Sequence, residues 1–119
     1  MSLIQLLMTP SEHLDAAFAA LAHPARRAIL QRLSKGAATV NELAEPFAIS
    51  LPAVSKHIHV LEEAGFILRT KNAQFRSCSL NPEPLAAVVN WAEEYRPIWE
   101  ARFDTMARIL ESKSGNENG

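Results

Sequence analysis

The chain has 119 residues, of which 48% are hydrophobic and 21% charged, and its formal net charge is −1. This composition is typical of one folded globular domain and excludes a disordered or fibrous protein. No apolar run approaches the roughly 18 residues of a membrane span, and the N-terminal LIQLLM lacks the basic flank and cleavage site of a signal peptide. The single cysteine, Cys78, excludes an internal disulfide framework. We therefore expect a cytoplasmic protein without membrane contact.

The charge is distributed unevenly along the chain. Residues 24–76 contain eight Lys or Arg and four Asp or Glu, a balance of +4. Residues 1–23 contain two acids and no base, and from Pro82 onward four bases stand against seven acids, a balance of −3. This asymmetry predicts that the basic region 24–76 faces a polyanion and that the acidic segments on either side of it have a different function. A module that contacts other proteins would show the same pattern.

Two helices are predicted in the first third of the chain. Thr9-Pro10-Ser11-Glu12 forms a capping box with proline at the first helical position. His23-Pro24 ends this helix and begins the next, which Lys35-Gly36 ends. The apolar residues of each helix share one face: Leu14, Phe18 and Leu21 in the first, and Ile29, Leu30 and Leu33 in the second.

The segment 39–65 has the outline of a helix-turn-helix. Thr39 and Glu42 form a second capping box, which opens a short helix whose end is uncertain because of Pro46. Ser50 then caps a helix that Gly65 ends. Two short helices joined by a tight turn are typical of a DNA-binding motif whose second helix enters the major groove. The first helix is expected to bury Val40, Leu43 and Phe47.

The second of these helices, Leu51–Ala64, has one core face and one face for DNA. Val54, Ile58 and Leu61 share the core face. The backbone amides at the N-terminus of a helix are suited to bind phosphates. Hydroxyl and basic side chains further along the helix can contact phosphates and the edges of the DNA bases. The DNA-facing set is Ser50, Pro52, Ala53, Ser55, Lys56, His57 and His59. Alternatively, Lys56 and His59 form only a solvated face, and His57 packs at the border of the core.

A β-hairpin pattern follows at once. The strands are expected at Phe66–Thr70 and Phe75–Leu80, around the turn Lys71-Asn72-Ala73-Gln74. Arg69, Lys71 and Arg76 gather near the tip, where they would meet phosphates or the minor groove. Exposed bases on a hairpin also protect a sheet edge against aggregation. A helix-turn-helix followed by such a hairpin predicts a winged helix.

The longest periodic segment runs from Pro82 to about Ser112. Such a helix would be about 45 Å long, more than a domain of this size covers by itself, and Pro97 is expected to kink or divide it. We therefore predict a homodimer, with Leu3, Ile4, Leu7 and Met8 in the same interface and residues 113–119 as a disordered tail after a single domain 1–112. The predicted dimerisation residues are Leu85, Val88, Ala92, Tyr95, Trp99, Phe103 and Met106, and Leu110 continues their stripe.

Several strings together resemble the ArsR family of bacterial winged-helix repressors. They are LAHPARRAIL at 21–30, ELA at 42–44, PAVSKHI at 52–58 and LEEAG at 61–65, and the similarity extends over residues 9–112. The resemblance implies a mostly α fold with a two-stranded hairpin wing and long terminal dimerisation helices. It also implies a dimeric repressor that leaves its operator DNA when an effector binds. By the family pattern, Ser50, Pro52, Ala53, Ser55, Lys56 and His57 lie on the DNA-facing helix.

The chain departs from the metal-sensing members of that family. Those members carry a cysteine pair before the recognition helix, where residues 42–46 here contain no thiol, and residues 82–119 contain no histidine. We therefore expect no metal and no cofactor, and the identity of any effector stays open. Cys78 is either a redox sensor or, more simply, a packing residue. Trp91, Tyr95, Trp99 and Phe103 either line a small-molecule pocket or form ordinary interface core.

No arrangement of residues predicts an enzyme. The sequence has no Gly-rich phosphate loop and no metal constellation, and His57 and His59 point to different faces of one helix. The sequence therefore predicts a sequence-specific transcriptional regulator, a dimeric repressor released by an unknown non-metal effector. The alternative is a winged-helix module that contacts proteins without binding DNA.

Overall fold

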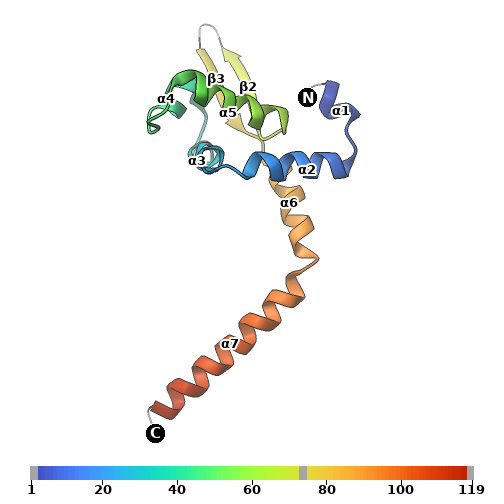
Figure 1. The fold of residues 1–119 in the computed structure, drawn as a ribbon, viewed down its shortest axis with the longest axis vertical. Coiled ribbons are helices and arrows are strands. Elements are labelled where there is room, and N and C mark those ends of the chain that lie inside the picture. The colour runs from blue at the N-terminus through green and yellow to red at the C-terminus, as the bar shows by residue number, and fades with distance from the viewer. Residues whose placement is uncertain (1–2, 73–74, 118–119) are drawn as a thin grey trace. The chain divides into compact units, whose positions relative to one another are not determined.

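A computed structural model describes residues 3–72 and 75–117, and the chain divides into two units, Met1–Val88 and Val89–Gly119. The division falls inside a helix, and the single domain over 1–112 stays a prediction. Figure 1 shows the order of the elements. The first unit contains α1 (Leu3–Leu7), α2 (Pro10–Leu21), α3 (Pro24–Leu33), β1 (Ala38–Thr39), α4 (Val40–Ala44), α5 (Leu51–Glu63), β2 (Ile67–Asn72), β3 (Phe75–Leu80) and the start of α6 (Glu83–Glu93).

The helix starts follow the capping signals of the sequence. The side chains of Thr9 and Thr39 each accept a hydrogen bond from the backbone N–H three residues on. The carboxylates of Glu12 and Glu42 accept from the backbone N–H of the capping threonine, so both capping boxes are confirmed. Ser50 caps α5 in the same way through the Ala53 N–H, at 3.3 Å. These side chains satisfy amides that a helix N-terminus otherwise leaves without partners.

The core joins the helix-turn-helix to the sheet. Val54, Ile58 and Leu61 of α5 are fully buried, as predicted. Helix α3 buries Ile29, Leu30 and Leu33, as predicted. The stripe predicted for α2 is wrong in part, because α2 buries Ala17 and Ala20 while Phe18 stays 37% exposed. Small residues sit there because α2 packs closely on α3. The other members of the core are Ala38, Leu43, Phe66, Ile67 and Cys78.

The wing is a three-stranded antiparallel sheet in the order β1-β3-β2. The two predicted strands are confirmed to within one or two residues, and Lys71 and Asn72, expected in the turn, belong to β2. The rest of the predicted turn, residues 73–74, lies outside the described residues. The third strand was not predicted. It pairs Ala38 with Cys78 and Thr39 with Ser77, and two residues are too few to show an alternating pattern.

The predicted C-terminal helix is divided in two, as expected from Pro97. Helix α6 ends at Glu93 and α7 (Arg96–Glu117) begins next to the proline, which is tolerated in the first turn of a helix. Arg96 bonds to Glu93 before the break and to Glu100 after it. The tail expected to be disordered from residue 113 is helical as far as Glu117; residues 118–119 lie outside the described part.

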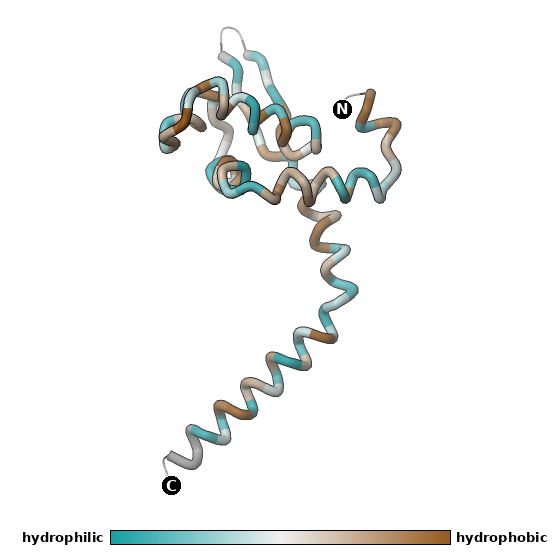
Figure 2. The backbone as a smooth tube through the Cα atoms, in the orientation of Figure 1, coloured by the Kyte–Doolittle hydropathy of each residue, from teal (hydrophilic) through white to brown (hydrophobic). Residues whose placement is uncertain are grey.

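The apolar residues of these two helices are packed against the core at the start of the stripe and exposed further along it. Leu85 and Val88 pack against the core of the same chain. Further along, Tyr95 in the turn before α7 is 44% exposed, and the apolar residues that recur on α7, as Figure 2 shows, are exposed too: Phe103 by 64%, Met106 by 56% and Leu110 by 63%. Helix α1 is similar, since Leu3, Ile4 and Leu7 are each more than 60% exposed. No helix in the described ranges has the length and apolar character to cross a membrane.

Candidate nucleic-acid interface

The outer face of α5 presents polar side chains at the end where the helix begins. Pro52 and Lys56 are exposed, Ala53 and Ser55 are half-buried, and the Ser50 hydroxyl stands at the helix N-terminus. The opposite face is locked into the core by Val54, Ile58 and Leu61. The helix is therefore held rigidly, with a small residue, a hydroxyl and a lysine on the side that faces away from the protein. A helix N-terminus attracts phosphates through its amides and its dipole.

Histidine and arginine side chains fix the helices behind α5. His23 caps α3 by accepting the Ala25 N–H through Nδ1 at 3.1 Å, which confirms it as a helix-boundary residue. Arg27 donates to the Leu21 carbonyl at 2.6 Å, and Arg26 approaches the Ala19 carbonyl at 3.4 Å. Both arginines thus neutralise the C-terminal end of α2. They stabilise the scaffold, as cations near the C-terminus of a helix do.

His57 packs on this scaffold. It is half-buried, and its ring centroid lies 4.4 Å from that of His23. Burial, and after it the proximity of His23 and Arg26, lowers the pKa of His57 below its usual value. Of the two interpretations of the sequence, the packing role is therefore present in the structure. The half-exposed edge leaves room for a DNA contact as well.

The basic residues of the wing fall into two groups. Lys71 and Arg76 are exposed and face each other across β2 and β3. Like charges at directly opposed positions of a sheet repel, which makes this end of the hairpin favourable for an anion. No ion pair involves Lys56, Lys71 or Arg76 within the described ranges 3–72 and 75–117.

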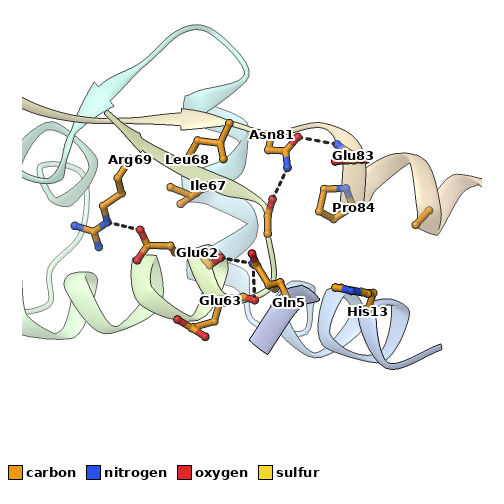
Figure 3. Close-up of a pocket in the computed structure, with 13 residues that line it drawn as sticks. Gln5, His13, Glu62, Glu63, Ile67, Leu68, Arg69, Asn81, Glu83 and Pro84 are labelled. Carbon is orange, nitrogen blue, oxygen red and sulfur yellow. Dashed lines mark hydrogen bonds and ion pairs between the residues drawn. The ribbon is translucent and has the colours of Figure 1, made fainter. Parts of the chain in front are cut away.

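Two other residues predicted to contact DNA, Arg69 and His59, lie next to carboxylates of the recognition helix α5. Arg69 lies 3.1 Å from Glu62, through Nε, and His59 lies 3.8 Å from Glu62 and 3.9 Å from Glu63. The carboxylates partly cancel these two positive or potentially positive groups. Figure 3 shows the pair between Arg69 and Glu62, which links the wing to the end of α5. The sequence placed Arg69 at the wing tip, whereas the structure places it beside Glu62.

Two polar residues near the end of α5 were missed from the sequence. Gln5, the buried residue of α1, donates through Nε2 to the Glu62 and Glu63 carbonyl oxygens at 3.1 and 2.9 Å. Asn81 donates to the Gly65 carbonyl at 2.8 Å and accepts from the Glu83 N–H at 3.3 Å. A polar residue inside the apolar run LIQLL, and an asparagine between a strand and a helix, were the available signals.

Cys78 lies inside the core. It is 1% exposed and is paired in the sheet with Ala38 on one side and Arg69 on the other. Burial raises the pKa of the Cys78 thiol, with a smaller opposing influence of Arg69. A buried thiol with a raised pKa is a packing residue rather than a reactive one, which favours the simpler interpretation. Within the part of the chain that the structure describes, no three His, Cys, Asp or Glu side chains gather as metal ligands.

The geometry agrees with proteins whose sequences and structures are known. A model of the helix-turn-helix domain matches residues 21–70. The chain is 39% identical to the transcriptional repressor SdpR of Bacillus subtilis, over 62% of this chain and 82% of that protein. It is 34% identical to the HTH-type transcriptional regulator Rv2034 of Mycobacterium tuberculosis, over 83% and 90% of the two chains.

A solved structure extends the match to the fold. The crystal structure of an ArsR family transcriptional regulator superimposes with a TM-score of 0.69 at 48% identity, covering 78% of this chain and 95% of that one. The match combines high identity with nearly the full length of the relative. The sequence and the fold thus agree with those of known regulators, and the chain belongs to the ArsR family of winged helix-turn-helix transcriptional regulators.

Proposed function

We propose that this protein is a homodimeric repressor that binds operator DNA and leaves it when a small non-metal effector binds. Helix α5 lies in the major groove, and the β2–β3 hairpin contacts the flanking backbone. Ser50, Pro52, Ala53, Ser55, Lys56 and the exposed edge of His57 face the DNA, and Lys71 and Arg76 bind phosphates. Arg69 and His59 contribute less, because Glu62 and Glu63 draw their side chains toward the protein.

This proposal rests on the basic side chains around α5 that form no ion pair within residues 3–72 and 75–117. Lys56 projects from the exposed face of the helix, and Lys71 and Arg76 stand opposite each other on the adjoining hairpin. A group of like charges that no neighbouring carboxylate balances raises the local positive potential and attracts a polyanion. Phosphate contacts of this kind supply much of the affinity of proteins for DNA.

The homodimer is supported by the exposed apolar residues of α7, of the end of α6 and of α1. Trp91, Ile98, Phe103 and Leu110 are each between 44% and 64% exposed, and their positions recur at three- and four-residue intervals with the remainder of the stripe. A stripe of several large apolar side chains exposed on a single chain marks an interaction surface. We therefore assign Ala92, Tyr95, Trp99, Phe103 and Met106 to an interface with a second copy, while Leu85 and Val88 serve the core.

A salt series of DNA-binding measurements tests the proposal. The purified protein is titrated by fluorescence anisotropy onto a duplex from upstream of its own gene and onto a scrambled duplex. We expect tighter binding to the native sequence and a steep loss of affinity with salt, since several phosphates are neutralised. Lys56→Ala and Arg76→Ala should each weaken binding about tenfold and reduce the log–log salt slope by about one.

Lys113→Ala serves as the control, because it removes an exposed base of α7 that lies outside the helix-turn-helix and the wing. It should leave affinity and salt slope unchanged. If Lys56→Ala and Arg76→Ala bind as tightly as the wild-type protein, the assignment of the groove-facing surface is wrong. Equally weak binding to both duplexes, together with a stoichiometric protein partner, would favour the protein-interaction module.

A further inference from the structure

A pocket of about 730 Å³ lies beside the C-terminal end of the recognition helix. Its walls come from α1, α2, the end of α5, the start of β2 and the start of α6, all within the first unit. Figure 3 shows Gln5 and Asn81 at the edge of the pocket. Gln5 donates hydrogen bonds to carbonyl groups at the end of α5, and Asn81 donates to the Gly65 carbonyl. Apart from Arg69, the residues that line the pocket lie outside the set assigned to DNA, although both surfaces use α5 and β2.

The charged groups around the pocket are mostly acidic. Three glutamates, Glu62, Glu63 and Glu83, are among the lining residues, against one arginine, Arg69, and one histidine, His13. That arginine is paired with Glu62 at 3.1 Å, and His59 lies 3.9 Å from Glu63, so Glu83 is the carboxylate that neither of them approaches. The C-terminal end of α5 adds carbonyl groups and the negative end of its helix dipole. For Glu83, no side-chain hydrogen bond or ion pair occurs within residues 3–72 and 75–117.

The remaining wall is apolar and partly open to solvent. Ile67 is buried and forms the floor, Leu68 is 51% exposed, and Pro84 and Ala87 of α6 lie across from them. Gly65 adopts a φ of +87°, and a Cβ at this position would lie 3.5 Å from both Gln5 and Pro84. The glycine therefore keeps this side of the pocket open. An exposed leucine beside carboxylates suits a ligand with one apolar and one charged end.

We propose that this pocket is the effector site of the protein and that it takes a small organic cation with an apolar body. The ammonium group pairs with the carboxylates that line the pocket, and the apolar body covers Leu68 and Pro84. An anion is excluded by the same carboxylates and by the helix end. A purely apolar molecule would leave them without a partner and would bind more weakly.

The position of the pocket explains how such a ligand acts on DNA binding, a step that rests on the function proposed above. Glu62 belongs to the recognition helix and Arg69 to the wing, and their ion pair connects the two DNA-facing elements. A cation that competes for Glu62 loosens this connection and changes the relative placement of α5 and the hairpin. Ligand and operator then oppose each other, and by linkage each lowers the affinity of the other by the same factor.

Binding is tested first without DNA, on the full chain. Isothermal titration calorimetry is carried out with 2-phenylethylammonium, with 2-phenylethanol as its neutral counterpart and 3-phenylpropanoate as an anion. We expect saturable binding of the ammonium, at least about tenfold tighter than that of either other probe. Equal affinities for the three probes, or no binding of the ammonium, would overturn the proposal.

Two substitutions locate the site. Glu83→Gln keeps the shape of the side chain and removes its charge, and it should weaken binding of the ammonium about tenfold. Glu111→Gln makes the same change on α7, outside the pocket, and should have no effect. Circular dichroism confirms that both variants fold. If Glu83→Gln binds the ammonium as tightly as Glu111→Gln, the site is not this pocket.

The effect on DNA is then measured on the duplex from upstream of the gene, with and without saturating 2-phenylethylammonium. We expect the ammonium to reduce the affinity for DNA about tenfold in wild-type protein and Glu111→Gln, but much less in Glu83→Gln at the same concentration. Unchanged DNA affinity in wild-type protein would overturn the effector role. If the ammonium binds but no DNA binds under any condition, the cation site stands and the proposed repressor function fails.

Discussion

The ring contact between His57 and His23 makes the junction of α5 and α3 sensitive to acid. His23 is held in place because its Nδ1 accepts a hydrogen bond from the Ala25 N–H. Burial lowers the pKa of His57 first, followed by His23 and Arg26, the two groups of α3 that face it. A second positive charge at His57 is therefore disfavoured in the folded protein.

This lowered pKa predicts a loss of stability on mild acidification. In the unfolded chain His57 takes up a proton near its usual pKa of 6.5, whereas the folded chain does so only at lower pH. The unfolded state thus binds more protons between the two pKa values, and the free energy of unfolding falls as pH falls through this window. Urea unfolding at about pH 7.5 and about pH 5.5 should show a larger loss for the wild type than for His57→Gln. The same pH dependence in both proteins would contradict this account.

The burial of Cys78 predicts an unreactive thiol. Its sulfur lies in the core and its pKa is raised by burial, so the reactive thiolate is both scarce and inaccessible in the native state. A disulfide reagent at mildly alkaline pH should react at least about a hundredfold more slowly with folded protein than with protein in denaturant, since reaction requires opening of the core. A fast native reaction would restore the redox-sensor interpretation.

Among the elements, α4 depends most on a single residue. It has five residues, too few for a helix that is stable alone, and the Thr39 side chain holds its first turn through the Glu42 N–H at 3.2 Å. The reciprocal bonds from Thr39 lower the pKa of the Glu42 carboxyl. Because α4 is the first helix of the helix-turn-helix and packs on α5, the cap supports the placement of the recognition helix.

Removing this cap should destabilise the protein measurably. Thr39→Ala leaves the Glu42 N–H without its acceptor and should lower the free energy of unfolding by about 1 kcal/mol. Thr39→Ser keeps a hydroxyl at the same position and should retain most of the stability. Denaturant unfolding of the three proteins provides the measurement. Equal losses in both variants would mean that the methyl group of Thr39, rather than its hydroxyl, matters.

At the scale of the whole molecule, we expect α7 to determine assembly. The apolar side chains of this helix are exposed in the single chain, and an isolated helix with such a stripe gains most of its stability from packing. Phe103→Glu places a charge in the middle of the stripe. We expect this variant to be monomeric at concentrations where the wild type is dimeric, as measured by light scattering after size-exclusion chromatography.

Arg108→Glu is the matched control for that experiment. Arg108 lies on the opposite side of α7 from Trp99, and its replacement changes the charge by more than Phe103→Glu does. It should remain dimeric. A wild-type protein that is monomeric under the same conditions, or equal masses for all three proteins, would refute the role of the stripe.

The sequence by itself determined the local structure. Capping residues, prolines and the spacing of apolar residues act within a few positions along the chain, so they predicted α2, α3, α4 and α5, both strands of the hairpin and the break at Pro97. The core face of α5 followed from the same spacing. The family strings predicted the membership that the comparisons confirm, because they combine these local signals in one order.

Only the tertiary structure decided how distant residues combine. The pairing of β1 with β3, the contact of His57 with His23 and the ion pair of Arg69 with Glu62 each join residues from separate elements. The hydrogen bonds of Gln5 span 57 and 58 positions. No periodic signal encodes such contacts, since each depends on the packing of whole elements around the core. For this reason the sequence predicted a basic wing, while folding decided which of its bases remain available to DNA.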